Sequence, residues 1–394
     1  TPMKRHRDRP LLVYLIALYL IIVRPLQAEE GHKVSYKYQL YTEDDGRMEI
    51  PSHYFLVETS LTDDLFVSAE VLTNIMTGSS PTGLVDLDNP DELQLAEIED
   101  QRWAYIVSLT KSIEDHAFTF EYARSEEDDY ISNGFTLRTE HDFNEKNTTL
   151  QLGVSYTDDL VTAVTLPGEL DKESLDFSVG LTQLLSPKTI LQANLTVGYS
   201  RGYLGDPYKS IGRNETFTIP GLPPFSERIA YFENRPDERL RTVFRLGLLH
   251  YFESLHGSFD GSYRLFQDDR GLRAHTIKLQ WNQEIGEKLV ISPYYRFYHQ
   301  DEADYYSVNL DGSDTIPNDE RSGQAPFFSA DYRLSNFDAH TYGIKAEYQL
   351  NDWLMIDAGY ERYIMSGNDA VTPSAAYPKA HVINLGLSAS LSAY

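Results

Sequence analysis

The chain of 394 residues contains no cysteine. This absence excludes a disulfide framework, a thiolate metal site and a cysteine nucleophile. Basic residues are also scarce, because 34 Lys and Arg stand against 60 Asp and Glu, which gives a formal net charge of −26. Such acidity argues against nucleic acid as a partner, since binding to phosphates needs basic side chains.

Beyond its first residues the chain has no apolar run long enough for a transmembrane helix. The N-terminal segment has a basic region with Lys4 and Arg5, the apolar run Leu11–Val23 and then Leu26-Gln27-Ala28. This order predicts a secretory signal peptide over residues 1–28. The alternative is a membrane anchor, but the apolar run is too short to span about 30 Å of hydrocarbon. Without a linker to divide it, we expect 29–394 to form a single domain.

Motifs for chemistry are missing as well. The sequence has no nucleophile elbow, no phosphate-binding glycine loop and no zinc-binding His-Glu-x-x-His. The acidic runs at Asp86–Glu92 and Asp311–Asp314 lack the spacing of a calcium loop. We therefore predict no catalytic residue, no metal site and no cofactor, and we expect that the protein is not an enzyme.

What the chain does have is alternation of apolar and polar residues, repeated along most of its length. In Thr341–Leu350, Tyr342, Ile344, Ala346, Tyr348 and Leu350 share one face, and polar or small residues share the other. Asn351-Asp352 then reverses the chain into Trp353–Tyr363, which alternates in the same way. Alternation sustained over about ten residues is typical of strands with one face in lipid and the other in a wetted interior.

This pattern predicts an all-β fold, a transmembrane antiparallel β-barrel of about 16 strands that resembles the porins of the outer membrane. The expected strands are 32–41, 52–61, 64–76, 102–112, 116–125, 131–141, 148–157, 173–184, 189–200, 239–251, 257–267, 271–282, 288–299, 339–350, 353–364 and 381–393. Long connections are expected at 77–101, 201–238 and 300–338, the last with room for another hairpin in Phe327–Leu334.

The pattern also predicts a location. The short connections are expected in the periplasm and the long ones outside, in the outer membrane of a Gram-negative bacterium. Lipid, lipopolysaccharide and the barrel assembly machinery are the expected partners, whereas the oligomeric state stays open. The 28 Tyr residues would suit an aromatic girdle at the membrane interfaces.

Two stretches of the chain resemble a family of Gram-negative outer-membrane barrels known only as a domain of unknown function. The first comprises Tyr41–Met48 and Ser52–Glu58, and the second comprises Asp331–His340 and Asn351–Tyr363. The resemblance covers nearly all of 29–394 and implies a barrel of this size. It implies no catalytic or binding residue.

Charged residues occupy the positions that the alternation turns inward. They are Arg241, Arg245, Arg264, Lys278, Arg296 and Lys345, with Glu121, Asp176, Asp260, Glu347 and Asp357. Such residues would create a transverse field that tunes selectivity. The alternative is a set of ion pairs that fill and rigidify the interior.

The connection 201–238 combines Pro220, Pro223 and Pro224 with aromatic residues. A long, proline-stiffened loop usually has packing of its own, so it could constrict the barrel mouth or form a contact surface outside. We interpret the protein as a passive channel for small solutes. The alternatives are a structural or docking barrel for a surface or periplasmic partner and, less favoured, an outer-membrane hydrolase.

Overall fold

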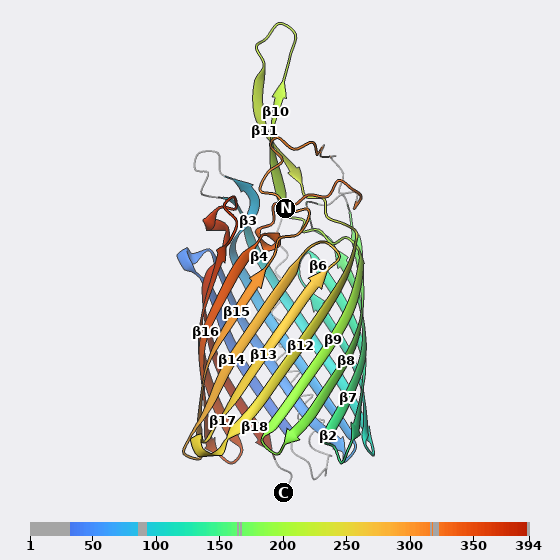
Figure 1. Ribbon diagram of the computed structural model, residues 1–394, viewed down its shortest axis with the longest axis vertical. Coiled ribbons are helices and arrows are strands. Elements are labelled where there is room, and N and C mark those ends of the chain that lie inside the picture. Colours follow the sequence, from blue (N-terminus) through green and yellow to red (C-terminus); the bar gives the residue numbers. More distant parts are fainter. Residues whose placement is uncertain are drawn as a thin grey trace, which may run out of the picture.

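The computed structural model describes residues 32–85, 93–163, 165, 168–315, 317 and 323–391. They form a closed antiparallel barrel of 16 strands with a separate two-stranded hairpin above it (Figure 1). The barrel strands are β1 (His32–Glu43), β2 (Met48–Thr62), β3 (Leu65–Val85), β4 (Leu93–Ile113), β5 (His116–Glu126), β6 (Tyr130–Phe143), β7 (Thr148–Val161), β8 (Leu170–Ser186), β9 (Thr189–Gly202), β12 (Glu238–Phe252), β13 (Gly257–Asp268), β14 (Arg273–Ile285), β15 (Leu289–Gln300), β16 (Phe337–Asn351), β17 (Leu354–Gly367) and β18 (Lys379–Leu391). All sixteen expected strands are present, and the predicted fold class is confirmed. The predicted signal peptide lies outside the described residues.

Consecutive strands pair with each other around the barrel, and two pairings complete the ring. β9 pairs with β12 across the hairpin strands, and β1 pairs with β18. His32 is opposite Leu391, so the first and last described residues meet at the end where the short turns lie (Figure 1). Ser35 and Ser388 are joined across this seam by a side-chain hydrogen bond of 2.9 Å.

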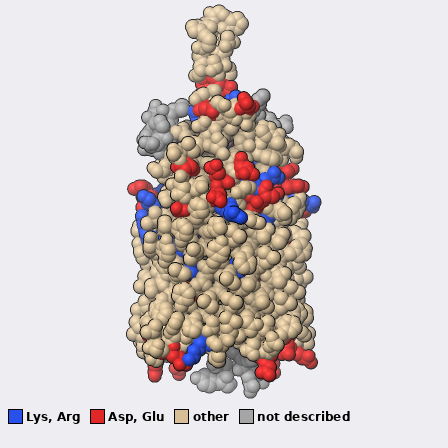
Figure 2. Space-filling model, in the orientation of Figure 1, with Lys and Arg blue, Asp and Glu red and all other residues tan. Residues whose placement is uncertain are grey.

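The outer wall carries the apolar residues of the alternating pattern. On β18, Ile383, Leu385 and Leu387 are exposed, Leu385 by 52%. Figure 2 shows a wall largely free of charge between a band of Lys, Arg, Asp and Glu at the upper rim and another at the lower end. An exposed apolar belt between charged ends is what a lipid-facing wall requires. No helix in the described part of the chain is long and apolar enough to cross a membrane.

Several strands are a few residues longer than predicted, and β3 and β4 extend the furthest. β3 and β4 remain paired up to Pro81 and Leu95, so most of the expected loop 77–101 is strand. Thr77–Ser80 consists of small and polar residues that show no apolar face. Above the apolar belt both faces of a strand meet water, so backbone pairing continues there without alternation.

The connection 201–238 contains a hairpin of β10 (Ser210–Phe217) and β11 (Phe225–Phe232), which projects away from the barrel (Figure 1). Phe217 and Phe225 stack at its far end with ring centroids 5.5 Å apart. The further hairpin considered for Phe327–Leu334 is wrong. This segment instead ends in the short 3₁₀ helix η3 (Tyr332–Leu334) and joins the loops through the bridges Asn234–Phe328 and Tyr306–Ser329.

Candidate functional site in the capped barrel interior

The long connections pack together over the mouth of the barrel. We call the described residues 203–209, 233–237, 301–315 and 323–336 the cap. The cap contributes Leu310, Phe328 and Ala330 to a buried cluster with Ile211. It contributes Ala303 and Leu334 to a second cluster, with Leu272 and Ala274 from the β13–β14 edge. The cap is therefore a packed layer with its own apolar core.

Buried charges join the two halves of the cap. Asp331 is only 1% exposed. Arg333 Nε lies 2.9 Å from both carboxylate oxygens of Asp331, and Arg235 Nη2 lies 2.7 Å from the Asp331 Oδ2. Burial alone would raise the pKa of Asp331, but Arg333 and Arg235 together hold it well below its usual range. Because Arg235 comes from the first long loop and Asp331 from the second, this ion pair fastens one loop to the other.

Two further buried charges extend the network. Glu233 accepts a hydrogen bond from Ser329 and lies 2.7 Å from Arg235 Nε, and burial raises the pKa of its carboxyl group. Lys209 donates to the Ser80 hydroxyl at 3.2 Å and to the Pro81 carbonyl, at the upper end of β3. Burial lowers the pKa of Lys209. The cap is thus tied to the barrel rim as well as to itself.

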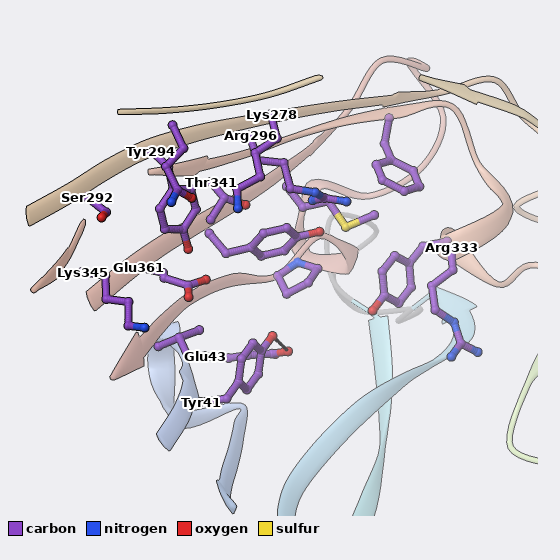
Figure 3. Close-up of a pocket in the computed structure, with 17 residues that line it drawn as sticks. Tyr41, Glu43, Lys278, Ser292, Tyr294, Arg296, Arg333, Thr341, Lys345 and Glu361 are labelled. Carbon is purple, nitrogen blue, oxygen red and sulfur yellow. Dashed lines mark hydrogen bonds between the residues drawn. The ribbon is translucent and has the colours of Figure 1, made fainter. Parts of the chain in front are cut away.

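The barrel interior beneath the cap contains a cavity of about 900 Å³. Figure 3 shows Tyr294 and Arg296 on one side of it and Tyr41 and Glu43 on the other. Other lining residues are Lys278, Ser292, Thr341, Lys345, Glu361 and Arg333. The cavity is therefore lined by polar and charged groups from β1, β14 to β17 and η3, together with the apolar residues Phe337, Met365 and Val382.

A second cavity, of about 690 Å³, lies directly under the cap. Its wall includes Arg241, Arg264, Phe266 and Tyr298 from the barrel, and the cap supplies Tyr203–Tyr208, Arg235, Asp331 and Leu334. Arg333 lines both cavities. Both alternatives for the connection 201–238 are found in part. Its two ends belong to the cap over the barrel mouth, and its middle forms the hairpin that projects outward.

Some of the predicted lumenal charges are neutralised by partners. Arg241 Nη2 contacts Asp176 at 2.7 Å, and Lys345 contacts Glu347 at 2.8 Å and Asp357 at 3.8 Å. Inward glycines accommodate these side chains: a Cβ at Gly198 would collide with Asp176, and one at Gly386 would collide with Asp357. Arg241 and Lys345 therefore form ion pairs inside the barrel, which is the alternative to a role in selectivity.

Four other predicted residues are not neutralised. Arg245, Arg264, Lys278 and Arg296 form no ion pair within the described part of the chain. They lie on the neighbouring strands β12, β13, β14 and β15, and we call them the basic stripe. Arg245 is directly opposite Arg264, and Lys278 is directly opposite Arg296.

Two inward carboxylates without an ion pair lie across the ring from the basic stripe, and two more, Asp260 on β13 and Glu361 on β17, lie on its own side of the described barrel. Glu70 on β3 and Glu121 on β5 alternate with the exposed apolar residues Ile75 and Phe120, so they face inward. In the strand order β3 stands eight strands from β13, and β5 stands eight strands from β15, which is half of the circumference. Neither carboxylate has an ion pair among the described residues. Glu70 and Glu121 therefore face the basic stripe across the lumen.

Histidines lie mainly on the outer wall. His275, His340 and His381 each bond through Nδ1 to a tyrosine hydroxyl on the next strand, at 2.7 to 2.8 Å. The cap network itself was not predicted from the sequence. The signal that could have found it is the apolar run Phe327–Ala330 directly before the charged Asp331 and Arg333, in a loop that otherwise reads as polar. A cluster of Asp100, Glu127 and Asp129 near the rim was missed as well, because Asp100 is distant in sequence from the other two.

A closed ring of 16 antiparallel strands with an apolar outer belt defines this protein as an outer-membrane β-barrel. A model of the family described as "Protein of unknown function (DUF3570)" matches residues 88–170 and 165–378, and the chain belongs to this family. The resemblance to a family of unknown function is thereby confirmed. No curated protein sequence matches the chain.

Several solved structures are similar in overall fold. OmpTdeltaL8, a loop L8 deletion mutant of the outer membrane protein OmpT of Vibrio cholerae, is 10% identical with a TM-score of 0.41, covering 91% of this chain and 98% of that one. CdiB from Acinetobacter baumannii is 8% identical with a TM-score of 0.49, covering 91% and 60%. The outer membrane protein opdK from Pseudomonas aeruginosa is 8% identical with a TM-score of 0.43, covering 92% and 98%. At such identities no function is transferred to this chain.

Proposed function

We propose that this protein is a passive channel for small solutes across the outer membrane. The observation that carries the proposal is the polar, cavity-containing interior, in which an unneutralised basic stripe faces unpaired carboxylates. A field of this kind across a wetted lumen sorts solutes by charge as they diffuse. The cap narrows the route at the mouth, and diffusion needs no cofactor and no chemical step.

The test is electrical. The purified, folded protein is expected to give discrete conductance steps in planar lipid bilayers. Heat-modifiable migration on gels shows whether the protein is folded. Folded protein that gives no conductance steps at any voltage would reject the channel. That result would favour the docking barrel, for which the projecting β10–β11 hairpin is the specific observation.

We further propose that the signal peptide exports the chain, that the assembly machinery inserts it, and that lipid and lipopolysaccharide surround it, with the cap outside. The absence of cysteine makes the orientation testable with single substitutions. Leu222→Cys in the hairpin should react with an impermeant maleimide on intact cells. Lys188→Cys in a short turn should react only after the outer membrane is opened, and the reverse pattern would overturn the orientation.

A further inference from the structure

We propose that the basic stripe is a binding site for small solutes that carry two or more anionic oxygen groups, such as diphosphates and dicarboxylates. The inference rests on the proposed function, because it names the class of solute that the channel takes. Arginine pairs bind phosphate and carboxylate groups through paired, charge-assisted hydrogen bonds.

The four cations form one continuous patch. Arg245 pairs directly with Arg264, and Lys278 pairs directly with Arg296. Arg264 is opposite Thr276, two residues before Lys278, so Arg264 and Lys278 are diagonal neighbours. Direct partners have Cβ atoms about 5 Å apart and diagonal ones about 7 to 8 Å apart. A single small molecule can therefore contact more than one cation.

Like charges directly opposite each other destabilise a sheet. The chain supplies carboxylates to cations next to the stripe, since Arg241 has Asp176 and Arg239 has Asp268 at 2.6 Å. It supplies none to the stripe, and Asp260, which is diagonal to Lys278, forms no ion pair with it among the described residues. Glu361 lines the same cavity as Lys278 and Arg296, but it forms no ion pair with them among the described residues. Two adjacent like-charge pairs without an ion-pair partner indicate a site whose counter-charge comes from a solute.

Aromatic rings contact three of the four cations without neutralising them. The Arg264 guanidinium lies 5.7 Å from the Phe266 ring centre, and the Arg296 guanidinium lies 5.5 Å from that of Tyr298. The Lys278 ammonium lies 5.1 Å from the Tyr294 ring centre.

Space for a solute lies beside the patch. Lys278 and Arg296 line the cavity of about 900 Å³, and Arg264 lines the cavity under the cap. Arg264, Lys278 and Arg296 thus lie beside aromatic rings on the inner face and line open space in the lumen.

The first test measures binding of inorganic pyrophosphate to the full chain in detergent by calorimetry. In the double variant Arg264→Gln/Lys278→Gln we expect binding at least about tenfold weaker than in the wild type. The matched control is Arg102→Gln/Arg138→Gln, which removes the same charge from β4 and β6. The control should stay within about twofold of the wild type. Equal losses in both variants, or no loss in the first, would overturn the site.

The second test concerns the number of anionic groups. Succinate should displace pyrophosphate from the wild type at least about ten times more effectively than acetate, and equal displacement would refute the requirement for two groups. Because calorimetry in detergent needs no current, the outcomes are separable. Protein that binds pyrophosphate through the stripe but conducts nothing would reject the channel alone, whereas protein that conducts without this binding would reject the site alone.

Folding of the variant is checked in the same preparation. The variant loses like-charge repulsion but also two cation–π contacts, so its midpoint of unfolding in denaturant should stay close to that of the wild type. A variant that unfolds at a much lower denaturant concentration would contradict the account of the stripe as uncompensated repulsion.

Discussion

Replacing Asp331 by asparagine is expected to release the cap from the mouth of the barrel. The carboxylate is 1% exposed and receives both Arg235 and Arg333. Breaking a buried ion pair typically costs about 3 to 5 kcal/mol. In the variant Arg235 still pairs with Glu233, and Arg333 still pairs with Asp206. Because neither cation loses its last carboxylate, we expect a cost at the lower end of this range, about 3 kcal/mol. About 3 kcal/mol shifts the ratio of docked to released cap by about a hundredfold.

Single-channel recording measures this shift as a longer time in the highest conductance state. Limited proteolysis gives an independent reading, because a released cap exposes the backbone of 301–315 to cleavage. The matched control is Asp314→Asn, which removes the same charge from an exposed position in the same loop. If Asp331→Asn and Asp314→Asn show equal dwell times and equal cleavage, the buried network does not hold the cap.

Three further changes test other parts of the structure. Although burial opposes them, Arg333 and Arg235 hold the pKa of Asp331 below its ordinary value of 3.8, so its contribution to cap docking is complete above pH 3.8 and declines below it. Cap cleavage should therefore increase as the pH falls from about 4 to about 2, and this increase should be absent in Asp331→Asn. Both proteins are compared in a Glu233→Gln background, because burial raises the pKa of Glu233 and its protonation acts in the opposite direction. Gly343→Ala should cost about 1 to 3 kcal/mol in denaturant unfolding, because its Cβ meets the Tyr294 ring, whereas Gly359→Ala, with its nearest neighbours at 3.6 Å, should change little. Replacing 216–226 by a short turn keeps the contacts of Asn214 and Arg228 with Asp311 of the cap. It should leave unfolding and conductance unchanged, and a loss of either would show that the outer part of the hairpin supports the cap.

The barrel itself could be predicted because its physical cause is local. Each strand must present one face to lipid, so the period of two is written into segments such as Thr341–Leu350 and needs no knowledge of distant residues. Prediction failed where both faces meet water, as in Thr77–Ser80, because no alternation is required there. The hairpin in 201–238 had a readable signal in Pro220-Gly221 between Phe217 and Phe225, which is typical of a turn between strands.

The site was predictable only in part. Alternation indicates which charges face inward, but it does not pair the strands. Arg241 and Arg245 lie on the same face of β12, yet only Arg241 stands beside a carboxylate, Asp176, two strands away in the ring. The cap could not be predicted from the sequence, because Arg235 and Asp331 are 96 residues apart and meet only after both loops fold.

The seam between β1 and β18 has a consequence for how the barrel is built. Ser35 and Ser388 are separated by 353 residues, whereas most other neighbouring strands are joined by short turns. Each doubling of a loop costs about 0.6 kcal/mol of closure entropy, so this contact costs about 3 kcal/mol more than a hairpin of ten residues. Until β18 arrives, the chain is an open sheet with two unpaired edges, which are the strand edges that aggregate. The two edges therefore need shielding for as long as β1 and β18 remain unpaired.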